Sequence, residues 1–193
     1  MDINEKTTYG EEFSKPIVHR VGRRIYFFSE VDPASICEAI KYIDQLERES
    51  KKPIEFFINS SGGYCYQGLA LYDRLRRCPC DIYMIATGFV ASMGFVIYLA
   101  GDVRYMTENC VLMNHQASID ITGKVSDVKI ETKEIVNLEE QISCIIADRT
   151  GKSLKKVKAE VKPGDCYIRA KEALEKGYAH KTILNKKCRS AKG

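Results

Sequence analysis

A serine in segment 88–94 stands where the chain could form a nucleophile. The apolar, β-rich run 82–86 ends before it, and an apolar run of helical length, 95–100, follows it. We therefore expect Ser92 at a strand-to-helix turn, where the first N–H groups of a helix have no intrahelical partner. A hydroxyl nucleophile needs such donors, because they stabilise the oxyanion that its attack creates. A simple helix N-cap is the alternative, and Val90 occupies the position of the first glycine in a Gly-x-Ser-x-Gly elbow.

A serine nucleophile needs a general base, and the chain has three histidines. His19 lies near the N-terminus and His180 lies near the expected last strand, whereas His115 leaves the end of an apolar strand for a polar turn. The alternative is that His115 is an ordinary surface or core histidine whose hydrogen bonds are satisfied by its surroundings. The residue types indicate a Ser/His/Asp set. They leave the orienting carboxylate open among Asp102, Asp120, Asp127 and Asp165.

A second glycine turn follows another short buried strand, 54–58. The double glycine in segment 59–63 lets the backbone turn sharply with exposed N–H groups. An amphipathic helix follows, with Leu69, Tyr72 and Leu75 on one side. A plain tight turn is the alternative, but two such turns side by side can each give one N–H to a single oxyanion hole.

Other segments supply the frame for these turns. A strand is expected at 24–28, and Asp32 and Pro33 then begin a helix as N-cap and first residue. The longest expected helix spans 126–150, with Ser126 as its cap and Gly151 at its end. Its apolar stripe comprises Val128, Ile135, Leu138, Ile142 and Ile145. The remaining predicted elements are strands at 103–106, 110–113 and 178–184 and helices at 153–162 and 170–176.

Composition restricts the class of protein. A chain of 193 residues is long enough for one domain with a real core. We predict a flexible N-terminal arm at 1–20, one domain at 21–185 and a basic tail at 186–193. The net charge of +4 comes from 30 basic and 26 acidic residues spread along the chain, which favours solvated surface over nucleic-acid binding.

Hydropathy and cysteine spacing predict the compartment. Residues 1–12 are too polar for a signal peptide, and no apolar stretch approaches 18 residues, so a soluble, cytoplasmic protein that binds no membrane is expected. The eight cysteines include one close pair, Cys78 and Cys80, without zinc-ligand spacing. Reduced thiols without metal are the expectation.

Four segments together resemble the successive signature blocks of the ClpP family, the proteolytic subunits of Clp proteases. They occur in the family's order and near its spacing, and the resemblance runs from about Ile25 to Ile183. The segments are 57–63, 91–94, 113–116 and 165–170.

This resemblance implies the α/β, ClpP/crotonase-like fold of repeated β-β-α units and a serine endopeptidase without cofactor. Ser92 would be the nucleophile, His115 the general base and Asp165 the carboxylate that orients the imidazole. The N–H groups of Gly63 and Met93 would form the oxyanion hole.

The resemblance also implies assembly. Seven-membered rings, stacked in pairs, would interlock through the 126–150 helix and enclose a chamber that admits unfolded polypeptides. An AAA+ unfoldase is the implied partner. Three departures bear on this expectation: Ser61 replaces a proline, Pro163-Gly164 replaces a charged pair used between rings, and the short arm lacks the family's opening motif.

Two other functions fit parts of the pattern. A crotonase-type acyl-CoA enzyme shares the fold and the paired N–H donors, but it would not need Ser92, His115 and Asp165 together. A non-catalytic subunit of a mixed ring typically loses one member of the triad, and this chain keeps all three residues.

Overall fold

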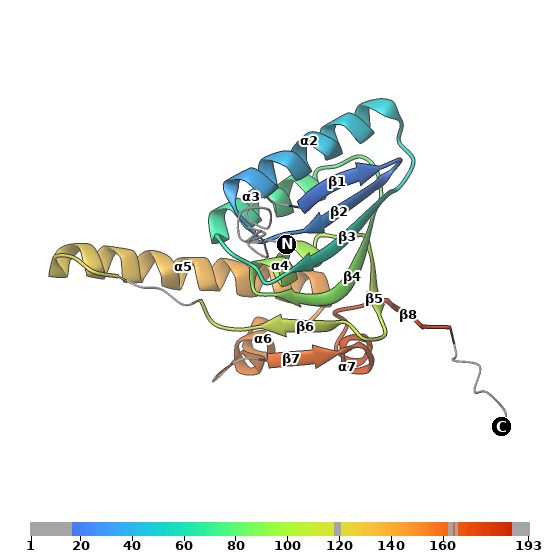
Figure 1. Ribbon diagram of the computed structural model, residues 1–193. Helices are drawn as coiled ribbons and strands as arrows, with labels where there is room; N and C mark the ends of the chain where they lie inside the picture. The colour runs from blue at the N-terminus through green and yellow to red at the C-terminus, as the bar shows by residue number, and fades with distance from the viewer. Residues whose placement is uncertain (1–16, 118–120, 162–163, 165, 187–193) are drawn as a thin grey trace, which may run out of the picture.

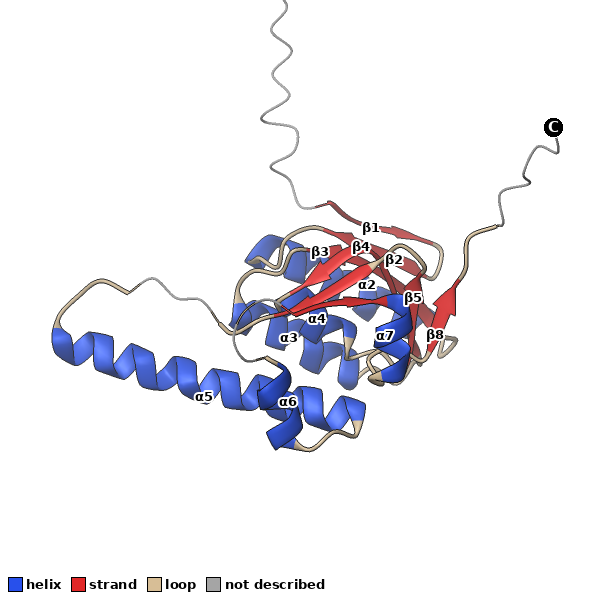
Figure 2. Cartoon of the chain, turned by 90° about the horizontal axis from the view of Figure 1, so that it is seen from below, coloured by secondary structure: helices blue, strands red, loops and turns tan. Residues whose placement is uncertain are grey.

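The computed structural model describes residues 17–117, 121–161, 164 and 166–186, and it builds one mixed sheet of eight strands. Helices α2, α3 and α4 cover one face of its central strands, as Figures 1 and 2 show. The strands are β1 (Ile17–Val21), β2 (Arg24–Phe28), β3 (Ile54–Ser60), β4 (Ile82–Ala91), β5 (Val103–Thr107), β6 (Val111–Asn114), β7 (Cys166–Arg169) and β8 (Lys181–Ile183). The helices are α2 (Pro33–Glu49), α3 (Cys65–Arg76), α4 (Met93–Tyr98), α5 (Val125–Thr150), α6 (Leu154–Glu160) and α7 (Ala170–Glu175).

Parallel pairing joins β2, β3, β4, β5 and β8, and this confirms the repeated strand–turn–helix pattern expected from the sequence. Strand β1 was not predicted. Residues 17–20, expected in the flexible arm, belong to β1 and pair antiparallel with β2. The hairpin closes at Gly22, whose φ of 58° suits glycine. Residues 1–16 of the expected arm and 187–193 of the tail lie outside the described residues.

Strand β4 pairs with two different strands along its length. Its first half pairs with β5 from Tyr83 to Ala86, and its second half pairs with β6 from Phe89 to Ala91. The sequence predicted an end at residue 86, which is wrong, because β6 supplies hydrogen-bond partners beyond Gly88. Strand β6 also pairs antiparallel with β7. Because the second half of β4 pairs in parallel with β6, these two strands end side by side at the same edge of the sheet.

The predicted helix caps and apolar faces are confirmed for α2 and α3. The Asp32 side chain accepts a hydrogen bond from the Ser35 N–H, and Pro33 is the first residue of α2. Helix α3 buries its predicted side, including Leu69, Tyr72 and Leu75. Helix α2 packs against α3 and strands β1 and β2, and α3 packs against the entirely buried helix α4, which also contacts β3.

Helix α5 is long, as predicted, and Figure 2 shows it extending well beyond the sheet. It begins one residue earlier than predicted, and Ser126 is not its cap. Lys124 holds the N-cap position without a side-chain cap bond, and the Ser126 hydroxyl instead donates to Asp127. Gly151 ends the helix in the left-handed conformation, as expected. Of the predicted stripe, only Leu138 is fully buried.

The C-terminal end of α5 is fixed by a buried arginine. The Arg104 guanidinium donates to the carbonyl oxygens of Tyr178 (2.8 Å), Arg149 (3.0 Å) and Gly177 (3.1 Å). Burial lowers the pKa of Arg104 to about 10, so it stays charged at neutral pH. These bonds hold residues 177–178 outside the last strand, and β8 is therefore shorter than the predicted 178–184.

The two predicted helices after α5 are present in shorter form, as α6 and α7. Lys152 and Tyr178 both bond the same Glu160 carboxylate oxygen, at 2.7 and 2.6 Å, and thereby join α6 to the segment before β8. No helix within the described part of the chain is long and apolar enough to span a membrane.

Candidate active site

Ser92 lies between β4 and α4, as predicted, in a backbone conformation that serine rarely adopts. Its φ is 53° and its ψ is −125°, and among the described residues no other non-glycine residue has a positive φ. Its N–H donates to the Met113 carbonyl oxygen at 3.0 Å. Its side chain makes no cap bond to α4, although it occupies the N-cap position. The geometry therefore disfavours the simple N-cap interpretation and leaves the hydroxyl for another role.

The second glycine turn lies directly against Ser92. A Cβ on Gly62 would be 2.6 Å from the Ser92 Cβ and 3.0 Å from the Met93 nitrogen, so only glycine fits this position. The Gly62 φ of +100° also requires glycine. The Gly62 N–H is held by the Ser60 hydroxyl at 3.2 Å. The two turns expected to lie side by side thus touch at Ser92.

The predicted oxyanion donors belong to these two turns. Met93 is the first residue of α4, and the N–H of a first helical residue has no intrahelical acceptor. Gly63 has a φ of +143°, and an isolated bridge to Val31 fixes its backbone. The Tyr64 N–H beside it donates to the Val31 carbonyl oxygen at 2.8 Å. Ser92, the N-cap of the six-residue helix α4, is half-exposed and lines the cavity with Met93, so the N-terminal end of α4 adjoins the cavity.

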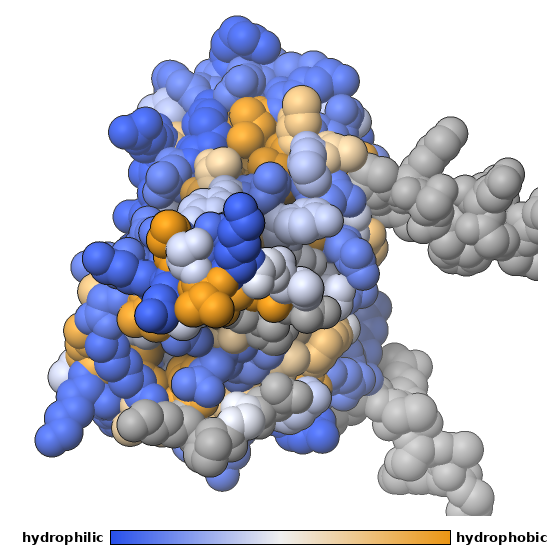
Figure 3. Space-filling view, turned by 90° about the vertical axis from the view of Figure 1, so that its left-hand side faces the viewer, coloured by the Kyte–Doolittle hydropathy of each residue, from blue (hydrophilic) through white to orange (hydrophobic). Residues whose placement is uncertain are grey.

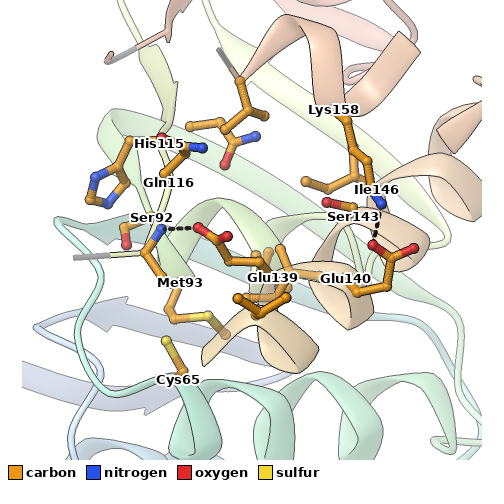
Figure 4. Close-up of a pocket in the computed structure, with 16 residues that line it drawn as sticks. Cys65, Ser92, Met93, His115, Gln116, Glu139, Glu140, Ser143, Ile146 and Lys158 are labelled. Atoms are coloured by element: carbon orange, nitrogen blue, oxygen red, sulfur yellow. Dashed lines mark hydrogen bonds and ion pairs between the residues drawn. The ribbon is translucent and has the colours of Figure 1, made fainter. Parts of the chain in front are cut away.

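His115 reaches the site because β6 runs parallel to the end of β4. Ala91 pairs with Met113, so Ser92 and His115 leave neighbouring strands at the same edge. Both residues line a cavity of about 260 Å³, and Figure 4 shows the imidazole beside the Ser92 side chain. The structure therefore brings together two of the three predicted catalytic side chains. The third, Asp165, lies outside the described residues.

The other candidate histidines and aspartates lie elsewhere or are engaged. His19 stacks on Tyr26, and His180 accepts the Arg104 N–H at its Nδ1 atom. Asp102 pairs with Arg76 at 2.7 Å, Asp127 is in the first turn of α5, and Asp120 is outside the described residues.

The far wall of the cavity comes from α5 and was not predicted. The α5 residues that line the cavity lie on one face of the helix, because they follow one another at intervals of three and four positions. They are Val136, Glu139, Glu140, Ile142, Ser143 and Ile146. That spacing is visible in the sequence, but it does not tell which element faces the helix. Cys65 of α3 also lines the cavity, and burial raises the pKa of its thiol. No group of three or more potential metal ligands occurs within the described ranges.

Comparisons of the sequence and of the structure with known proteins all point to the same family. The Clp protease family matches residues 10–186. An ATP-dependent Clp protease proteolytic subunit 2 from Chlamydia trachomatis serovar D is 33% identical over 180 residues, which are 92% of this chain and 80% of that protein. A Pseudomonas aeruginosa protein of the same name is 32% identical over 167 residues, 86% of this chain and 83% of that protein.

A solved structure agrees with the sequence relatives. A ClpP1 variant from Listeria monocytogenes superimposes with a TM-score of 0.78 at 30% identity, over 85% of this chain and 92% of that one. The likeness covers most of both chains, so it extends to the ClpP-like α/β fold and not only to the serine turn.

Proposed function

The chain belongs to the Clp protease family and is a serine endopeptidase of the Clp type, and we propose that Ser92, His115 and Asp165 are its catalytic triad. The observation that carries this proposal is the Ser92 turn. A serine held at a positive φ, with no cap bond to its own helix, shares one cavity with a histidine from the neighbouring strand. The acyl-CoA enzyme considered above is not favoured, because the relatives are proteolytic subunits.

The proposed reaction proceeds through an acyl-enzyme. His115 removes the proton from the Ser92 hydroxyl as its oxygen attacks the peptide carbonyl, and the proton then passes to the leaving amine. The N–H groups of Met93 and Gly63 would stabilise the oxyanion. Asp165 would hold the histidine tautomer that leaves the other ring nitrogen free to accept the proton. Water then hydrolyses the acyl-enzyme by the same route.

A fluorophosphonate tests the nucleophile directly. It should add one mass increment per chain, on Ser92, and Ser92→Ala should prevent the addition. Ser92→Ala or His115→Ala should each lower kcat by roughly 10⁴–10⁶-fold, with a smaller loss for Asp165→Ala. Ser61→Ala should stay within about tenfold of the wild type. Assembled Ser92→Ala protein that cleaves peptides at the wild-type rate would show that the triad is wrong.

We further propose that the chain works as seven-membered rings, stacked in pairs through α5, that degrade unfolded polypeptides. Helix α5 supports this, because Val125, Ile130 and Val136 on it are 72%, 68% and 58% exposed. Figure 3, which looks at the side from which α5 projects, shows apolar groups among hydrophilic ones. Burying such groups against other subunits would be favourable.

Sedimentation and digestion test this assembly. A 21.9 kDa monomer as the sole species at micromolar concentration would rule out the ring. Single rings should be detectable beside stacked pairs, because Pro163-Gly164 replaces a charged contact pair. Folded proteins should require an ATP-driven AAA+ unfoldase, so digestion of a stable folded protein by this chain alone would contradict the enclosed chamber.

A further inference from the structure

The cavity beside Ser92 combines apolar walls with one carboxylate that has no cationic partner among the described residues. Met93 and Val96 of α4 and Ile142 and Ile146 of α5 form apolar walls. Glu139 lines the same cavity from α5, and it is only half-buried. A long aliphatic side chain can pack on such walls while its polar end reaches a charged group.

Three carboxylate or ammonium side chains line the cavity, and two of them neutralise each other. Glu140 of α5 is ion-paired with Lys158 of α6. Glu139 accepts the Ala117 N–H at 3.0 Å through its Oε1 atom, and the described residues provide it with no lysine or arginine. Figure 4 shows both bonds as dashed lines, with Glu139 on the side nearer to Ser92. Among the described residues, the charges that line the cavity therefore sum to a net negative charge near the nucleophile.

The Ala117 bond also fixes where this charge lies. Ala117 is two residues after His115, so the bond holds the Glu139 carboxylate close to the strand end that supplies the proposed base. One carboxylate oxygen is used by the backbone, and a carboxylate can accept further hydrogen bonds at the other. A cationic group in the cavity can thus pair with Glu139 without displacing Ala117.

We propose that Glu139 is a specificity-determining residue that favours lysine or arginine immediately before the bond that is cleaved. This inference rests on the proposed function, since it takes Ser92 as the nucleophile. The side chain of the residue whose carbonyl is attacked would enter the adjoining cavity. Its methylene groups would pack on the walls formed by α4 and α5, and its cationic end would pair with Glu139.

Matched peptide substrates test the proposal in the assembled, full-length protein. Two fluorogenic peptides would differ only in the residue before the cleaved bond, which is lysine in one and uncharged norleucine in the other. The wild type should have a kcat/KM for the lysine peptide roughly tenfold above that for the norleucine peptide. Glu139→Gln, which keeps an acceptor for Ala117, should abolish most of this preference. Its kcat for the norleucine peptide should stay within about threefold of the wild type.

A variant on the same helix controls for general charge effects. Glu131→Gln removes an equal charge from an exposed position outside the cavity, and it should change the lysine preference less than about twofold. Equal cleavage of the two peptides by the wild type, or an unchanged preference in Glu139→Gln, would overturn the role of Glu139. Norleucine cleavage and fluorophosphonate addition to Ser92 would then still support the protease. If both are absent from assembled protein, the proposed function fails and this inference fails with it.

Discussion

Replacing Gly62 by alanine should disable the site without removing any proposed catalytic group. The new Cβ would be 2.6 Å from the Ser92 Cβ, 2.9 Å from the Ala91 oxygen and 3.0 Å from the Met93 nitrogen. Carbon atoms in contact prefer about 3.5–4.0 Å, so the two turns must separate by about 1 Å. A displacement of that size can lower the rate about 10²-fold.

The same substitution should also destabilise the fold. The φ of +100° is strained for alanine, which costs about 1–3 kcal/mol, and overpacking adds a similar amount. We therefore expect a loss of roughly 2–6 kcal/mol in the free energy of unfolding. Urea denaturation at fixed protein concentration would measure it, and peptide hydrolysis by protein shown to be assembled would measure kcat.

Gly22→Ala is the matched control. Gly22 also has a positive φ, of +58°, but a Cβ there would meet nothing within 4 Å. Gly22→Ala should lower the free energy of unfolding by only about 1–2 kcal/mol and leave kcat within about threefold of the wild type. If Gly62→Ala retains a comparable kcat, the contact between the two turns does not position Ser92.

Three further predictions concern residues around the C-terminal end of α5. Burial lowers the pKa of His180 below the ordinary 6.5, so the unfolded chain takes up its proton first, and stability should fall as pH decreases from 6.5. His180→Asn, which keeps an acceptor for the Arg104 N–H, should show a smaller fall in urea midpoint between pH 7.5 and 5.5; an equal fall would refute the assignment. Arg104→Met should lower the free energy of unfolding by roughly 3–5 kcal/mol, because buried carbonyl oxygens lose their donor, and a loss below about 1 kcal/mol would contradict this. Lys152→Met and Glu160→Gln should show an interaction energy of about 0.5–3 kcal/mol in a double-mutant cycle measured by denaturation, whereas additive effects would mean that the pair is not coupled.

The sequence predicted those parts of the fold and of the candidate site that depend on local spacing. Asp32 and Pro33 mark the start of α2, because a cap and a helix-compatible proline act on adjacent residues. Ser92 was placed at a strand-to-helix turn by the apolar runs on either side of it. Four segments in one order along the chain, 57–63, 91–94, 113–116 and 165–170, carried the resemblance to the Clp protease family, to which the chain belongs.

Tertiary structure decided what depends on contacts between distant segments. Strand β1 exists because β2 pairs with it, and β4 continues past residue 86 because β6 extends the sheet there. The φ of Ser92 and its contact with Gly62 require the two turns to meet, although 30 residues separate them. Glu139 likewise reaches Ala117 only because α5 packs along the cavity that the end of β6 also lines. Helical spacing shows that a face exists, but packing alone determines which side chains it meets.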